Sequence, residues 1–223
     1  MLLALLLMAT ATAAKAQDDP EYRMEIGAGA GVVNYLGDYN SSLLGSTQPM
    51  GTLTAKYRKN PRMAWTLAIG YGQLKGDIKD GQTWYPDQET LPATFSHPLI
   101  DAGLRFEYNF WAYGTGREYR GARPWAPYIT FGLGVTHVSA SPSVFTMNLP
   151  LGLGLKYKMA ERLNLGIAWM MHLTGGDKLD GVADPYAIKS SGLFKNTDCY
   201  STLLLTLTYD IWAECKTCNN DRD

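Results

Sequence analysis

Hydrophobic and polar residues alternate along most of the chain with a period of two. From Phe145 to Tyr157, hydrophobic residues occupy nearly every second position, and small or polar residues such as Asn148 and Gly152 lie between them. Strict alternation of this kind predicts β-strands with one apolar face. Eight ranges show it, with the weaker copies in the first three: 22–36, 49–58, 63–74, 99–110, 125–138, 144–158, 163–174 and 199–212.

The predicted strands are long, and this separates two classes of β-protein. Strands of soluble sandwiches usually have about 5–6 residues, whereas strands of about 9–11 residues, apolar outward and small or polar inward, are typical of transmembrane barrels. Such a sheet must close, because lipid offers no partner for an unpaired backbone group. We therefore expect an all-β fold, an eight-stranded antiparallel transmembrane β-barrel. A soluble sandwich or a lipocalin-like calyx, with the apolar faces in a core, is the alternative.

Charged residues lie on the inner parity of the predicted strands. The interior of eight strands is just wide enough for side chains, and the small residues of that parity leave room for the larger ones. We expect these charges to pair with one another inside the barrel and not to form a catalytic set. The expected lumen charges are Arg23, Glu25, Lys56, Asp101, Arg105, Glu107 and Lys156.

Composition fits this interpretation and excludes two other classes. Charged residues make up 18% of the 223 residues, below the roughly 25% of soluble domains. The formal net charge of −1 leaves no basic excess for nucleic-acid phosphates. The mean hydropathy of −0.17 argues against a bundle of membrane helices, and no run of about 20 apolar residues provides a spanning helix.

The first residues predict export. Residues 1–16 form a signal peptide in this interpretation, with Ala14-Lys15-Ala16 as the cleavage site. An anchor helix would need about 20 apolar residues, and Lys15 interrupts the run sooner. The expected organisation is a signal peptide 1–16, a polar leader 17–21, an outer-membrane barrel 22–212 and a tail 213–223.

Connection lengths predict the orientation in the membrane. The turns 59–62 and 159–162 are tight, and the link 111–124 joins the fourth and fifth strands at the same end. Short periplasmic turns and longer outer loops are the usual asymmetry, so both termini are expected in the periplasm. The long outer loops are 37–48, 76–95 and 175–197, while 139–143 is short. Aromatic girdles are expected at the inner ends from Tyr57, Trp65, Tyr108, Phe110, Trp125, Tyr157, Tyr209 and Trp212, and at the outer ends from Tyr35, Tyr71, Trp169 and Tyr200.

Three cysteines remain, an odd number for an exported chain. Cys215 and Cys218 lie in the tail, and Cys199 begins the last strand, which places it at the opposite membrane surface. The tail pair is a local disulfide, a point of partner attachment or metal binding, or inert. A single C-x-x-C is weak evidence for zinc, which generally takes four ligands. We predict no metal site and no cofactor.

One short motif raises the possibility of an enzyme. His137-Val138-Ser139 is similar to the catalytic pair of small outer-membrane barrels that deacylate lipopolysaccharide. A histidine base needs an orienting carboxylate, and no Asp or Glu occurs between Glu118 and Glu161. We therefore interpret His137 as an interfacial residue, Ser139 as a loop residue, and the chain as a non-enzyme. A lipid A-modifying hydrolase remains the least favoured alternative.

An ordered set of segments resembles a known family. Its members are Asn34-Tyr35-Leu36-Gly37-Asp38, Glu107-Tyr108-Asn109-Phe110 with Tyr113, 126–132, 149–157, Leu179-Asp180-Gly181-Val182 and the tail cysteines. Together they resemble the PorG-like outer-membrane barrels associated with the type IX secretion system. The resemblance spans about residues 22–218.

The resemblance implies a structural or anchoring role. In that family the barrel contacts the periplasmic ring of the secretion machine, which includes a PorK-like lipoprotein and PorN. The chain departs from the family pattern at 172–180, so a paralogue without the ring contact, or a barrel for envelope integrity or adhesion, remains an alternative. By position, we expect periplasmic contact through the link 111–124 and the tail 213–223. The candidate residues are Trp111, Arg117, Arg120, Arg123 and Lys216.

Overall fold

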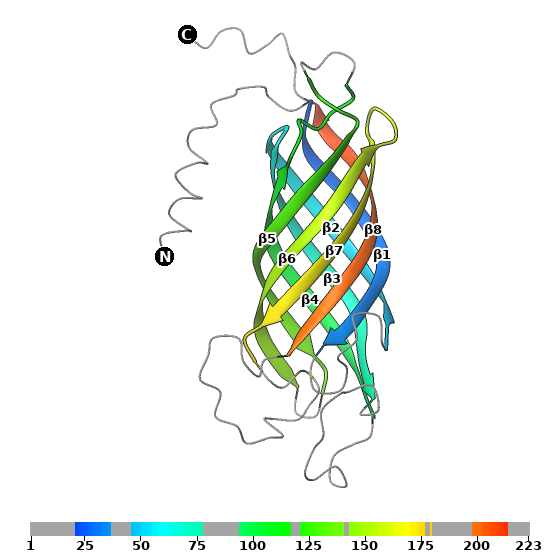
Figure 1. Ribbon diagram of the computed structural model, residues 1–223, viewed down its shortest axis with the longest axis vertical. Coiled ribbons are helices and arrows are strands. Elements are labelled where there is room, and N and C mark those ends of the chain that lie inside the picture. The colour runs from blue at the N-terminus through cyan, green and yellow to red at the C-terminus, as the bar shows by residue number, and fades with distance from the viewer. Residues whose placement is uncertain are drawn as a thin grey trace, which may run out of the picture.

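Eight antiparallel strands close into one barrel in the computed structural model (Figure 1). The structure describes residues 21–36, 46–77, 94–116, 121–140, 143–176, 179 and 198–213. No helix in these ranges is long and apolar enough to cross a membrane. The strands are β1 (Tyr22–Leu36), β2 (Gln48–Asn60), β3 (Met63–Asp77), β4 (Thr94–Asn109), β5 (Trp125–Val138), β6 (Val144–Lys158), β7 (Leu163–Thr174) and β8 (Cys199–Ala213).

Each strand pairs with its neighbours in the sequence, and the first strand closes on the last. The β1–β8 ladder runs from Tyr22↔Ala213 to Leu36↔Cys199. Closure removes the free edges that an open sheet would expose, as a sheet in lipid requires. The predicted eight-stranded antiparallel barrel is confirmed.

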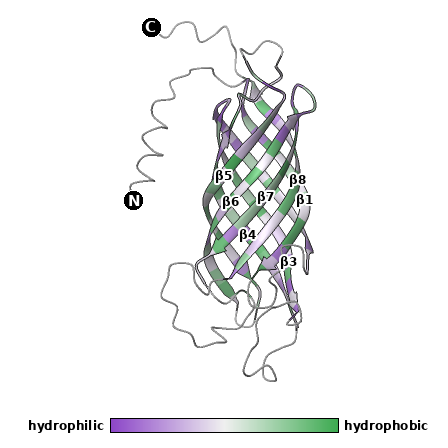
Figure 2. Cartoon of the chain, in the orientation of Figure 1, coloured by the Kyte–Doolittle hydropathy of each residue, from purple (hydrophilic) through white to green (hydrophobic). Residues whose placement is uncertain are grey.

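The outer wall is apolar, and no described part of the chain packs against it. Along β3, Trp65, Leu67, Ile69 and Tyr71 are about half exposed or more, while the residues between them are buried. Figure 2 shows hydrophobic residues along the barrel wall. A continuous apolar surface of this extent calls for a nonpolar surrounding, and the hydrocarbon core of a bilayer supplies one.

The two ends of the barrel differ. We call "turn end" the end with the turns 61–62 and 159–162 and the link between β4 and β5. The start of β1 and the end of β8 lie there too, and it is at the top of Figure 1. The opposite end is the "loop end". Most aromatic residues of the expected girdles are exposed on the wall, among them Tyr57, Trp125 and Tyr71. Tyr35 and Tyr200 contradict the prediction, because both point inward and are fully buried.

The β3–β4 hairpin is longer than the sequence pattern indicated. It pairs up to Asp77↔Thr94, whereas alternation predicted strands ending at 74 and beginning at 99. The reason lies in its inner face, where Phe95 and Leu99 are buried. A pattern that assumes apolar residues outward does not detect a segment whose apolar residues point inward.

Candidate functional site: the barrel lumen and the turn-end link

Charged side chains fill the half of the lumen nearest the turn end. Arg58 lies between two carboxylates: its Nη2 donates to Glu25 Oε2 at 2.7 Å and to Asp210 Oδ1 at 2.9 Å. Lys158 also pairs with Asp210, and Asn164 Nδ2 donates to Asp210 Oδ1 at 2.9 Å. One carboxylate on β8 therefore joins side chains from β2, β6 and β7.

A second carboxylate organises the neighbouring part of this half. Glu107 accepts from Lys156 Nζ at 2.5 Å and Thr66 Oγ1 at 2.7 Å, and Lys56 Nζ lies 2.9 Å from it. Lys56 also lies 3.8 Å from Glu25 Oε1, which connects the two groups. All these charged side chains are buried. The turn-half network consists of Glu25, Lys56, Arg58, Glu107, Lys156, Lys158 and Asp210.

The structure separates the expected lumen charges into three groups. Glu25, Lys56, Glu107 and Lys156 lie in the turn-half network. Arg23 lies near the turn end and is partly exposed. Asp101 and Arg105 are buried. Among the described residues Arg105 forms no ion pair, so the expected pairing is wrong for Arg105, whereas Asp101 lies 3.9 Å from His172 Nδ1.

Three members of the network were not among the predicted site residues. Arg58 follows Lys56 on the inner parity, and Lys158 follows Lys156. Asp210 lies on the inner parity of β8, opposite Glu25 in the register. Parity alone could have identified them, but each lies near a strand end, where a charge also fits a solvated turn.

In the loop half, neutral donors surround one carboxylate. Asp101 Oδ1 accepts from Tyr200 Oη at 2.7 Å, Asn148 Nδ2 at 2.6 Å and Thr136 Oγ1 at 3.3 Å. His172 stacks on the Tyr200 ring, with centroids 4.3 Å apart, and its Nδ1 lies 3.9 Å from Asp101 Oδ1. Several neutral hydrogen bonds can stabilise a buried carboxylate without a cation.

An apolar cluster packs inside the loop half. Here apolar packing takes the place of the ion pairs found in the turn half. The Tyr35 ring packs edge-on against the Phe95 ring, with centroids 5.0 Å apart. Asp198 accepts from Tyr35 Oη at 2.5 Å and from the Leu179 amide at 2.8 Å. The members are Val33, Tyr35, Met50, Leu74, Phe95, Leu99, Val138, Met170, Leu179, Tyr200 and Leu204.

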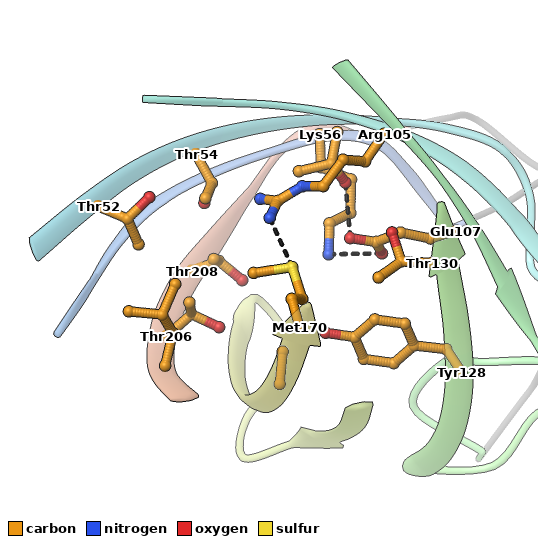
Figure 3. A pocket seen from close by; sticks show the side chains of 13 residues that line it. Thr52, Thr54, Lys56, Arg105, Glu107, Tyr128, Thr130, Met170, Thr206 and Thr208 are labelled. Atoms are coloured by element: carbon orange, nitrogen blue, oxygen red, sulfur yellow. Dashed lines mark hydrogen bonds and ion pairs between the residues drawn. The ribbon is translucent and has the colours of Figure 1, made fainter. Parts of the chain in front are cut away.

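A cavity of about 30 Å³ lies between the two halves (Figure 3). A water molecule needs a cavity of about 10–15 Å³, so this cavity has room for about two water molecules. Its walls carry Arg105, Lys56, Glu107, Tyr128 and several threonines. This space is too small for a lipid or peptide substrate.

The link after β4 folds against the turn end. The Tyr113 amide donates to the Pro61 carbonyl at 3.1 Å, and within the link the Gly114 amide donates to the Arg123 carbonyl at 3.1 Å. Tyr113 is buried, and its hydroxyl donates to Asn164 Oδ1 at 2.8 Å. Thr115 Oγ1 donates to Glu21 at 2.7 Å. These contacts hold the described part of the link against the barrel mouth.

The same link presents an aromatic and cationic surface. Trp111 packs edge-on against Trp125 at 4.3 Å, and the Arg123 guanidinium lies 4.9 Å from the centre of the Trp111 ring. Arg123 is exposed and Trp111 is half-buried. We call Trp111, Arg123 and Trp125 the link platform. Arg117, Arg120 and Lys216 lie outside the described residues, as do Cys215 and Cys218.

His137 and Ser139 do not form a catalytic arrangement with the described residues. His137 is on the outward parity of β5, opposite Ile100 and Phe145. The Ser139 amide donates to the Pro98 carbonyl at 3.0 Å, but neither side chain forms a hydrogen bond within the described ranges. A general base therefore lacks its orienting partner among those residues.

Metal ligands do not gather in the described part of the chain. No group of three or more His, Cys, Asp or Glu side chains there could hold a metal ion. Cys199 is a free thiol at the loop end, at the other end of β8 from the tail.

Comparison with protein families shows which proteins this barrel belongs with. A family described as "Outer membrane protein beta-barrel domain" matches residues 1–188. The chain belongs to this family. It is therefore an integral outer-membrane barrel, in agreement with its closed sheet and apolar wall. No curated protein matches the chain significantly.

Solved structures of other outer-membrane proteins are similar to this chain. Neisserial surface protein A is 15% identical, with a TM-score of 0.51, and the match covers 84% of this chain and 97% of that one. OprG from Pseudomonas aeruginosa is 13% identical with a TM-score of 0.47, covering 87% and 98%. The outer membrane enzyme PagL is 14% identical with a TM-score of 0.42, covering 84% and 99%. At these identities the first likeness supports the fold alone, and none assigns an activity to this barrel.

Proposed function

We propose that this outer-membrane barrel is a non-enzymatic anchor that holds a periplasmic component of a type IX protein secretion system through its turn end. The observation that carries the proposal is the link platform. Backbone hydrogen bonds within the link, to Ala112 and from Gly114, hold Arg123 in place. Its guanidinium lies against the Trp111 ring, which packs in turn against Trp125 of β5. Interfaces favour rigid aromatic and arginine side chains.

The rest of the described structure supports a structural role. The turn-half network and the apolar cluster fill the described part of the lumen, as expected of a barrel that does not transport a large solute. His137 and Ser139 lack a described partner that would activate them. The sequence resemblance to PorG-like barrels suggests the partner, a periplasmic ring with a PorK-like lipoprotein and a PorN-like protein. This proposal places the turn end and both termini in the periplasm.

Copurification from the native host tests the anchor. A tagged chain should recover the PorK-like and PorN-like proteins, and the double variant Trp111→Ala/Arg123→Ala should recover much less of both. Removal of residues 214–223 tests the tail separately. Failure of the wild-type chain to recover any ring protein, together with normal secretion after deletion of the gene, would overturn the proposal.

A matched control uses the other end of the barrel. Trp169 is exposed on the wall and Lys75 is exposed near the loop end, so Trp169→Ala/Lys75→Ala removes the same kinds of side chain. It should leave recovery unchanged. Heat-dependent mobility on SDS gels should show that both double variants still form the barrel. Loss of recovery in the control instead would point to a partner at the loop end, as the adhesion alternative requires.

A further inference from the structure

Arg105 is a buried cation that forms no ion pair with a carboxylate among the described residues. Its side chain is 8% exposed, and its one hydrogen bond to a described residue runs from Nη1 to Met170 Sδ at 2.7 Å. A guanidinium carries five N–H donors and cannot lose its charge in a protein, and a thioether is a weak acceptor. An isolated buried charge is strongly unfavourable, and no described residue supplies the negative group that would neutralise Arg105.

The nearby carboxylates are engaged elsewhere. Glu107, two residues along the same strand, is held by Lys156 and Lys56. Asp101 is four residues away, roughly 13 Å along an extended strand, and it accepts from Tyr200 and other neutral donors. Neither carboxylate neutralises Arg105.

Positive charge is in excess on this side of the lumen. The four cations of the turn-half network exceed its three carboxylates by one, and Arg105 next to it adds a further positive charge. The cavity wall itself carries two cations, Arg105 and Lys56, and one carboxylate, Glu107, so its charged lining is positive by one. A small anion there would be attracted by this remaining positive charge.

The cavity wall also offers hydroxyl donors. The Thr54 hydroxyl forms no hydrogen bond with a described residue, and Thr206 makes only a long one, 3.4 Å, to the Gly166 carbonyl. Figure 3 shows Arg105 extending toward the space between Thr54 and the pair Thr206 and Thr208. Thr208 is already engaged with Glu25, so Thr54 and Thr206 are the hydroxyls able to turn toward an anion.

We propose that the lumen cavity is a binding site for one small inorganic anion of the halide class, such as chloride. Arg105 supplies the charge-assisted hydrogen bonds, Lys56 adds a second positive charge, and Thr54 and Thr206 complete the shell. The cavity volume, about 30 Å³, suits a monatomic ion and excludes a phosphorylated headgroup. The ion is a structural ligand that neutralises a cation inside the barrel, and it is independent of any periplasmic partner.

Bromide in place of chloride tests the site directly. Crystals of the wild-type barrel grown in sodium bromide should give an anomalous difference peak within hydrogen-bonding distance of the Arg105 guanidinium. Electron density for water alone, with no anomalous signal in the cavity, would overturn the proposal. This test uses the wild-type chain, so it does not depend on whether a variant folds.

Thermal unfolding in detergent provides the solution test. Wild-type barrel should have a higher Tm in sodium chloride or bromide than in sodium gluconate of equal ionic strength, because gluconate is too large for the cavity. Arg105→Met should abolish this difference, and Thr54→Val should reduce it. Arg62→Met is the control, since Arg62 is exposed and donates to the Phe110 carbonyl; it should keep the full difference. Equal Tm values of the wild type in the two salts, or an unchanged difference in Arg105→Met, would contradict the proposal.

Discussion

The two halves of the lumen satisfy their buried polar groups by different means, although the same outer wall surrounds both. In the turn half, buried charges form ion pairs, as Arg58 does with Glu25 and Asp210. In the loop half, Asp101 is surrounded by neutral donors such as Tyr200, and an apolar cluster fills the remaining space. The alternating pattern determines which residues point inward. Which groups then pair with a buried polar side chain depends on the strands across the lumen.

This difference determines how each half should respond to mutation. Removing one member of an ion pair leaves its partner charged and buried. Removing part of an apolar side chain leaves a cavity and costs contacts. The predictions below use both responses to test the contrast between the halves, from the largest expected effect to the smallest.

Asp210→Ala should give the largest loss of stability. It leaves both Arg58 and Lys158 without the carboxylate that joins them. Loss of one partner of a buried pair destabilises by about 3–5 kcal/mol. Urea unfolding in lipid vesicles, followed by tryptophan fluorescence, measures the change. Glu161→Ala is the control, because Glu161 is exposed and its one hydrogen bond with a described residue is from Tyr22; the loss of stability should be below about 1 kcal/mol. Equal losses would contradict the importance of the turn-half network.

Leu99→Ala tests the loop half. Leu99 is fully buried in the apolar cluster, and large-to-small substitutions of this kind destabilise by about 2–5 kcal/mol. The same unfolding measurement applies. Leu53→Ala is the control, since Leu53 is 66% exposed on the wall and lipid can fill the vacated space. A loss no greater than that of Leu53→Ala would show that the cluster is not tightly packed.

Two glycines compare rigid with flexible neighbours. A Cβ at Gly154 would lie 2.3 Å from Tyr128 Cζ, and a Cβ at Gly70 would lie 2.3 Å from Met50 Cε. Gly154→Ala should destabilise by about 1–3 kcal/mol, because the ring must move as a unit. Gly70→Ala should destabilise less, because a methionine end adapts easily. The free energies of unfolding of the two variants are measured in parallel. A larger loss of stability in Gly70→Ala than in Gly154→Ala would contradict this prediction.

Tyr113→Phe should give the smallest effect. It removes one neutral hydrogen bond, to Asn164, which contributes about 0.5–1.5 kcal/mol. Tyr157→Phe, on the exposed wall, is the control and should have no measurable effect. A loss as large as that of Asp210→Ala would show that the link contributes far more than this bond.

The effect of Tyr113 should also depend on pH. Burial raises the pKa of Tyr113 above its ordinary value of 10.0, so the folded state keeps the phenol proton while the unfolded chain releases it as the pH rises. Its stabilising contribution is therefore present below about pH 10 and is lost above it. The difference in stability between wild type and Tyr113→Phe should narrow at alkaline pH. A difference in stability that stays constant as the pH rises above 10 would contradict this prediction.

Much of the lumen could be predicted from parity, and its pairing could not. The sequence placed Glu25, Lys56 and Glu107 on the inner faces of three strands, where the structure has them. It gave no means to foresee that Lys56 would contact both carboxylates, because that depends on how the barrel brings distant strands together. The girdle prediction for Tyr35 and Tyr200 failed for a related reason. An aromatic residue at a strand end fits a membrane interface and a lumen equally well.

The period of two by itself determined the closed barrel with an apolar wall, because lipid excludes unpaired backbone and leaves a long alternating sheet no other stable form. Only the tertiary structure decided what each inward side chain meets. Arg105 and Asp101 share one strand and one face and carry opposite charges, yet the structure places Arg105 against Met170 and Asp101 against Tyr200. Those neighbours come from β7 and β8, and strand closure, which no local pattern encodes, brings them across the lumen.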